Sequence, residues 1–176
     1  YALNADDDNL LDKGVRMVDF WASRSMTPSG LPKTWFEPFW GSEGTFTSGD
    51  ADMRTMSDGM EGAVDAYRVM QEHGVTKSEW LDFAASFGDW LVANQNDDGS
   101  YYRIYGFDSK PVHTGKFNTT NPIRFLIKLY GATGERKYLD AAEKAGDYAY
   151  ANIYEPSLYV GGTSDNNNTI DKEAGV

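Results

Sequence analysis

Three segments of the chain carry nearly the same alternation of hydrophobic and polar residues. Each begins with a Leu-Asp pair, at Leu11, Leu81 or Leu139, and a second aspartate followed by an aromatic residue comes seven residues after the first. Seven residues make almost two helical turns, so both aspartates lie on one face of a helix. The second aspartates are Asp19, Asp89 and Asp147. The pattern predicts three copies of one amphipathic helix.

The copies start 70 and then 58 residues apart. Common helical solenoids repeat at about 34 to 47 residues, so each copy here belongs to a longer unit. A two-helix hairpin followed by a long loop has a suitable length. The helix over residues 119–131 is apolar on most sides, which predicts an inner, buried helix between outer, amphipathic ones.

Capping and turn residues give the expected element boundaries. We expect helices over residues 8–25, from 57 or 58 to 74, over 77–95, from 119 or 120 to 131–134, over 136–152, and from 171 onward. Asp58 and Glu61 have the spacing of a capping box. Short strands at residues 101–105 and 111–112 are expected to form a β-hairpin. The long connections, residues 26–55, 95–118 and 154–169, then all fall on one common face, where function usually resides.

Composition excludes several classes of function. The net charge of −11 disfavours binding to nucleic acid or to an anionic membrane, since both require a basic surface. No apolar run approaches the length of a membrane span. The absence of cysteine excludes disulfides and thiolate metal sites. We expect a single domain over residues 1–176 that is a fragment of a longer protein, with an extracellular or periplasmic location favoured.

Two stretches carry a resemblance to a known superfamily. WLVANQNDDGSY at residues 90–101 is similar to the turn after an outer helix in six-hairpin toroid glycosidases, and YVGGTSD at residues 159–165 is similar to the segment before an inner helix. The resemblance implies an all-α chain built of helical hairpins, an incomplete (α/α)6 toroid of about half a ring, with long loops and a short β-hairpin on one face. In such toroids the N-terminal ends of the inner helices line a sugar-binding cleft.

Glycoside hydrolysis requires two carboxyl groups about 5 to 10 Å apart across a cleft. The motif Glu61-Gly-Ala-Val parallels Glu173-Ala-Gly-Val, so Glu61 and Glu173 are matching positions at the starts of inner helices. Caps that favour the helix dipole are the alternative interpretation of these acids. Our candidate catalytic residues are Glu173, Asp171, Glu61 and Asp58. Asp50, Asp52 and Asp165 are further carboxyl groups expected on the loop face.

Aromatic faces combined with polar side chains are typical of sugar sites, because a pyranose has an apolar CH face and polar edges. The segment WFEPFW at residues 35–40 either packs on the scaffold or forms a stacking platform. The candidate substrate-binding residues are Trp35, Glu37, Trp40, Tyr102, Arg103, Tyr105 and His113. Arg124, on the apolar inner helix, is expected to pair with a buried carboxylate.

No metal and no cofactor is expected. Asp165, Asn167, Thr169 and Asp171 alternate oxygen ligands, but the glycine and the distal glutamate of an EF-hand are missing. Two histidines and no cysteine disfavour zinc.

The sequence therefore favours a glycoside hydrolase, or a fragment of one, that acts on an oligosaccharide or polysaccharide. A non-catalytic carbohydrate-binding or scaffold module and a polysaccharide lyase remain open. A plain helical interaction repeat is disfavoured by the long aromatic loops. The missing half of the ring or a second copy of the chain is the expected protein partner.

Overall fold

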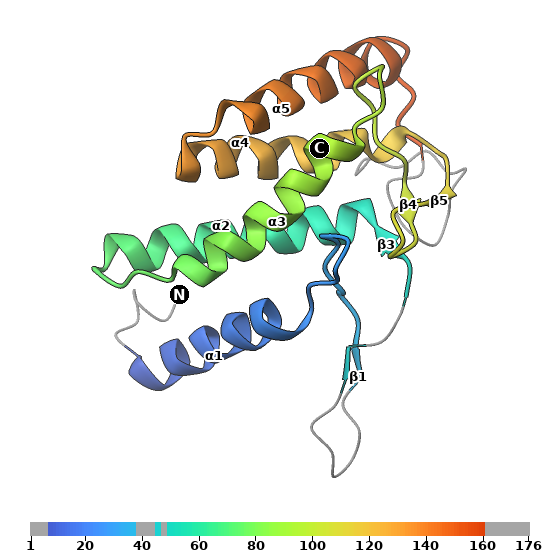
Figure 1. The fold of residues 1–176 in the computed structure, drawn as a ribbon. Coiled ribbons are helices and arrows are strands. Elements are labelled where there is room, and N and C mark those ends of the chain that lie inside the picture. The colour runs from blue at the N-terminus through green and yellow to red at the C-terminus, as the bar shows by residue number, and fades with distance from the viewer. Residues whose placement is uncertain (1–6, 38–44, 47–48, 161–176) are drawn as a thin grey trace.

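The computed structural model describes residues 7–37, 45–46 and 49–160. Figure 1 shows the helices stacked beside one another, with strands β3, β4 and β5 gathered at one end of them. The helices are α1 (Asp8–Arg24), α2 (Met53–Glu72), α3 (Ser78–Asn94), α4 (Asn121–Thr133) and α5 (Arg136–Ala149). A 3-10 helix (Phe117–Thr120) precedes α4, and a π-helical turn (Tyr150–Tyr154) extends α5. The strands are β1 (Phe36–Glu37), β2 (Thr45–Phe46), β3 (Ala51–Asp52), β4 (Ile104–Tyr105) and β5 (Pro111–His113).

The inner helices α2 and α4 run parallel to each other. Arg124 donates to Glu61 at 2.8 Å and Lys128 donates to Asp65 at 2.6 Å, and both pairs are separated by 63 residues in the chain. Paired residues keep the same separation in sequence along two helices only when the two helices run in the same direction. The expected pairing of Arg124 with a carboxylate is confirmed, with Glu61 only 13% exposed.

The outer helices pack closely because small residues face inward. On α5 the buried stripe is made of Tyr138, Ala141, Ala142, Ala145 and Ala149. On α3 a Cβ atom added at Gly88 would overlap Leu129 of α4 and Tyr138 of α5. Glycine therefore lets α3 approach both helices of the following hairpin.

None of the helices in the described part of the chain combines the length and the hydrophobicity that a membrane span requires.

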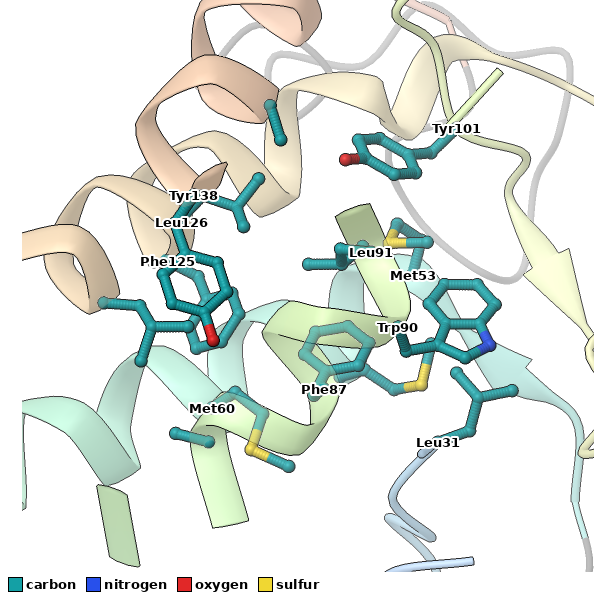
Figure 2. Close-up of a cluster of buried hydrophobic side chains, with 14 of the residues drawn as sticks. Leu31, Met53, Met60, Phe87, Trp90, Leu91, Tyr101, Phe125, Leu126 and Tyr138 are labelled. Carbon is teal, nitrogen blue, oxygen red and sulfur yellow. The ribbon is translucent and has the colours of Figure 1, made fainter. Parts of the chain in front are cut away.

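The hydrophobic core lies between α2, α3 and α4 and is rich in methionine and aromatic residues. Figure 2 shows Phe87 and Trp90 of α3 beside Met53 and Met60 of α2. The rings of Phe87 and Phe125 are 5.4 Å apart, and those of Phe87 and Trp90 are 6.1 Å apart. This packing fixes the position of the inner helices and so of the loops that precede them.

A three-stranded antiparallel sheet joins two of the long loops. The predicted hairpin is confirmed as β4 and β5, and β3 adds a third strand that the sequence did not predict. Ala51 pairs with Tyr105 in this sheet, and the Met53 amide donates to the Arg103 carbonyl at 2.9 Å. The sheet therefore anchors the loop before α2 to the loop before α4.

The predicted start of the second helix was wrong. The helix begins at Met53, where Asp52 is the N-cap and accepts a hydrogen bond from the Thr55 amide at 3.1 Å. Met53, Met56 and Met60 continue the buried stripe of the helix toward its start. Asp58 and Glu61 consequently lie inside the helix, and their capping-box spacing has no capping role.

Candidate functional site

A surface pocket of about 300 Å³ lies at the start of α2, next to strand β3. It is lined by Asp52, Arg54, Thr55 and Asp58. The Asp52 carboxylate is engaged in capping the helix. Asp58, six residues further along, therefore supplies the carboxyl group of this pocket that no backbone cap occupies.

Asp58 is a largely exposed carboxylate whose pKa is raised above its usual value. Its side chain is 62% exposed, and the Arg54 Nε atom lies 3.7 Å away. Partial burial raises the pKa of Asp58, and the nearby Glu61 raises it further, while Arg54 and Arg124 act in the opposite direction. A carboxyl group that holds its proton to higher pH is suited to general acid catalysis.

Glu61 occupies a different environment from Asp58. Its carboxylate accepts hydrogen bonds from Arg124 at 2.8 Å and from Lys128 at 2.7 Å, so it links α2 to α4. Because it lies more than two turns into α2, it does not project from the first turn as predicted. Its geometry is that of an ion pair between inner helices.

The aromatic segment of the first loop is partly packed on the scaffold and partly exposed. Phe36 packs edge to face on Phe20 at 5.2 Å and contacts Phe46 at 5.3 Å. Trp35 remains 66% exposed. Phe36 therefore fixes the loop on α1, while the Trp35 ring is presented to solvent.

Tyr105 is part of the core rather than of an open surface. It is 2% exposed, and its ring meets Trp90 edge to face at 4.7 Å. The Tyr105 hydroxyl accepts a hydrogen bond from the Tyr102 amide at 2.9 Å. Arg103 is also buried, at 2% exposure, whereas Tyr102 is half-buried. Of these three predicted binding residues, Tyr102 alone has a substantially accessible side chain.

His113 is the last residue of β5, which is an edge strand of the sheet. Its Nδ1 atom accepts a hydrogen bond from the Gly115 amide at 3.1 Å. His113 is half-buried.

Lys116 is a cation of this loop that the sequence analysis missed. Its ammonium group binds Asp98 at 2.6 Å and lies over the rings of Tyr102 and Tyr148 at 5.8 and 5.7 Å. Partial burial alone would raise the pKa of Asp98, but the hydrogen bonds from Lys116 and Ser100 lower it. The pair joins Tyr102 to the turn after α3.

Asn118, just before α4, is a second residue that sequence reasoning missed. It is 2% exposed, and neither of its side-chain amide atoms has a hydrogen-bond partner among the described residues. A buried amide without partners costs about 1–3 kcal/mol. Groups kept at such a cost are common at functional sites.

Replacing Asn118 with leucine should therefore stabilise the fold. The two side chains have similar volumes, and the substitution removes two unpaired polar atoms, so we expect a gain of about 1 kcal/mol. Urea unfolding of the variant and of the natural chain measures the difference. A loss of stability would show that the Asn118 amide makes a bond essential to the fold.

Four of the predicted residues lie outside the described residues: Trp40, Asp165, Asp171 and Glu173. Glu37 lies in β1, where its backbone pairs with Thr45. In the described part of the chain, no group of three or more His, Cys, Asp or Glu side chains could hold a metal ion.

Comparison with known structures shows the fold. The chain is similar to a GH76 α-mannanase of Bacteroides thetaiotaomicron, with a TM-score of 0.58 and 22% identity over 85% of this chain. That protein is a six-hairpin (α/α) toroid glycosidase. The predicted fold class, helical hairpins of an (α/α)6 toroid, is thereby confirmed.

The chain spans 40% of the length of the mannanase that it matches. No protein-family model matches the sequence, and a comparison with curated proteins finds no significant match. The similarity therefore establishes the architecture of the chain and does not by itself establish an enzymatic activity.

Proposed function

We propose that this chain is a single-domain portion of a toroid glycoside hydrolase that binds an oligosaccharide or polysaccharide at the strand-bearing end of its helices. The single observation that carries the proposal is Asp58, a carboxyl group of raised pKa in a pocket at the start of an inner helix. The toroid fold supports it, because the similar mannanase is a glycosidase of the same architecture.

In this proposal Asp58 is the general acid that protonates the leaving oxygen of the glycosidic bond. The second carboxyl group comes from Asp171 or Glu173, which lie outside the described residues. Glu61 holds α2 and α4 together through Arg124 and Lys128. That pairing keeps the start of α2, and hence Asp58, in place.

The sugar would be held by aromatic and polar groups of the two loops. Trp35 offers an exposed indole face for the CH side of a pyranose. Tyr102 and His113 offer polar atoms for its hydroxyl groups. α-Mannan is the first polysaccharide to test, because the protein of similar structure is an α-mannanase.

The function is tested by a glycan-array screen followed by an assay for new reducing ends on each glycan that binds. The proposal expects binding and release of reducing ends from the same glycan. Binding without cleavage, by this chain and by any longer form of the protein, would instead indicate a non-catalytic binding module. An unsaturated product with ultraviolet absorbance would indicate a lyase.

Replacing Trp35 with alanine should weaken glycan binding about 2- to 12-fold while leaving stability nearly unchanged. Aromatic stacking contributes about 0.5–1.5 kcal/mol, and surface substitutions usually change stability by less than about 0.5 kcal/mol. Isothermal titration with the best array glycan measures the change. Met17→Ala is the matched control, since Met17 is 72% exposed on α1 and has no place in the proposed site. Equal affinities of both variants would remove Trp35 from the site.

A further inference from the structure

The inner helices α2 and α4 face each other in a fixed register, and both begin at the strand-bearing end of the molecule (Figure 1). Two ion pairs join them, Glu61 with Arg124 and Asp65 with Lys128. In both pairs the α4 residue follows the α2 residue by 63 positions. Residues three apart lie one turn apart on the same face of a helix. One turn toward the start of both helices, the register therefore places Asp58 opposite Asn121.

Asp58 and Asn121 are too short to bridge the two helices as the ion pairs do. The axes of packed helices lie about 8–10 Å apart, a distance that a long arginine or lysine side chain spans. The side-chain amide of Asn121 is half-buried, and within the described part of the chain it forms no hydrogen bond. A carboxyl group and an amide therefore face each other across the start of the inner helices without a bond between them.

The polar face of α4 continues to Asn118, one turn before Asn121. Asn118 lies in the 3-10 helix that leads into α4 and contacts α2, and the same register places it opposite Thr55. It is 2% exposed, and its side-chain amide has no hydrogen-bond partner among the described residues. Thr55 and Asp58 both line the pocket at the start of α2. Two side-chain amides before and at the start of α4 thus stand opposite two residues of that pocket.

The chemistry of this position is suited to a neutral sugar. An amide and a sugar hydroxyl each donate and accept hydrogen bonds, so they match without any charge. The cations beside this position pair with carboxylates of α2: Arg124 and Lys128 both bind Glu61, and Arg54 lies 3.7 Å from Asp58. A uronate or a sulfated sugar requires a cation to balance its charge. The side of the site formed by α4 therefore favours uncharged hydroxyl groups.

A capping role does not account for Asn121. It is the first residue of α4, and the N-cap position belongs to Thr120. A capping side chain accepts a hydrogen bond from a backbone amide two or three residues further on. The Asn121 side chain accepts no such bond from the described residues. The 3-10 helix already continues the chain into α4, through a bond from the Asn121 backbone amide to the Asn118 carbonyl.

We propose that Asn121 forms the side of the sugar site opposite Asp58 and binds a hydroxyl group of a neutral sugar whose glycosidic oxygen lies against Asp58. This role rests on the proposed function, since it requires a glycan in the pocket at the start of α2. Asn121 adds a specificity-determining residue from α4 to a pocket whose described lining comes from β3 and α2. Its role also explains why the start of α4 stays polar although Pro122 and Phe125 beside it are buried.

Asn121→Asp tests the facing of Asn121 and Asp58 without any sugar. A second carboxylate opposite Asp58 disfavours the charged form of Asp58, so the pKa of Asp58 should rise further. NMR of the Asp58 side-chain carboxyl carbon during a pH titration, with the signal assigned by Asp58→Asn, measures this pKa. Asn9→Asp is the matched control, because Asn9 is exposed in the first turn of α1. The control should leave the pKa of Asp58 unchanged.

Asn121→Ala tests the contact with the sugar. The loss of one neutral hydrogen bond should weaken binding about 2- to 12-fold. Isothermal titration with α-mannan, or with whichever neutral glycan the array screen identifies, measures the affinity. Asn9→Ala should bind as tightly as the natural chain. Polygalacturonate, a polymer of uronate, should bind to the natural chain more weakly than the neutral glycan does.

Two results would overturn the inference while the proposed function stands. One is a pKa of Asp58 that is the same in Asn121→Asp and in the natural chain, and the other is equal affinity of Asn121→Ala and the natural chain for the neutral glycan. Tighter binding of polygalacturonate would overturn the assignment of a neutral sugar. If the pKa rises as expected but no glycan binds, Asn121 does face Asp58, and the proposed function fails together with the binding role.

Discussion

Replacing Gly99 with alanine should lower the free energy of unfolding by about 3 kcal/mol, a fall in Tm of roughly 6–12 °C. A left-handed backbone costs an L-residue about 1–2 kcal/mol. The added Cβ atom would also overlap the backbone carbonyl of Lys144, which cannot rotate away as a side chain could. The displacement of α5 would strain the bond of 2.8 Å from Gln95 to the Ala141 carbonyl. Thermal unfolding followed by circular dichroism measures the effect.

Gly74→Ala is the matched control for this prediction. Gly74 has a similar backbone, with φ of 79°, but nothing lies within 4 Å of a Cβ atom placed there. Its variant should show the backbone cost alone, about 1–2 kcal/mol. If both variants lose the same stability, the close contact between the Asn96–Ser100 turn and α5 contributes nothing to the free energy of unfolding.

Replacing Asp58 with asparagine should lower kcat for glycoside cleavage by about 10²- to 10⁴-fold. General acid catalysis contributes rate enhancements of that size, and asparagine cannot give a proton to the leaving oxygen. Glycan binding should change much less, because the acid acts mainly in the transition state. Steady-state kinetics on the cleaved glycan separates kcat from KM.

Glu72→Gln is the control for Asp58, since Glu72 is exposed at the opposite end of the same helix. It should keep the activity of the natural protein. An Asp58→Asn protein with unchanged Tm and unchanged kcat would show that another carboxyl group is the acid.

The helical hairpins were predictable because hydrophobic periodicity reports burial directly. The boundaries of α1, α3 and α5 followed from the three copies to within a few residues. The start of α2 was not predictable from local spacing alone. Asp58 and Glu61 lie three residues apart, as in a capping box, but any helix places such residues one turn apart. The true cap, Asp52, stands before a methionine stripe whose burial depends on α3 and α4.

Contacts between distant segments explain what the sequence did not reveal. Strand β3 is two residues long and gains its partner from a loop more than fifty residues later. The recurrence of its motif at Glu173 makes Glu61 a candidate catalytic acid in the sequence, but the two cations that pair with it come from α4 and are not predicted by that motif. Asn118 is distinguished by the absence of partners, a property that exists only once the chain is folded.

The repeated aspartates show the opposite case. Their spacing predicted three copies of one amphipathic helix, and in the structure Asp19 and Asp89 join neighbouring outer helices. The sequence could not identify the donors, because Trp80 and Tyr138 differ in chemistry although they share a position. An indole N–H and a phenol O–H satisfy the same carboxylate, so the geometry repeats where the residue type does not.

The most direct test of the central claim is the pH dependence of glycan cleavage, measured as new reducing ends. Because partial burial raises the pKa of Asp58, the carboxyl group is protonated at low pH and loses its proton as the pH rises through that value. The account predicts that kcat/KM falls over this range and that the fall disappears in Asp58→Asn, together with most of the rate. A bound glycan that yields no reducing ends at any pH, or an Asp58→Asn protein with the natural rate and profile, would contradict it.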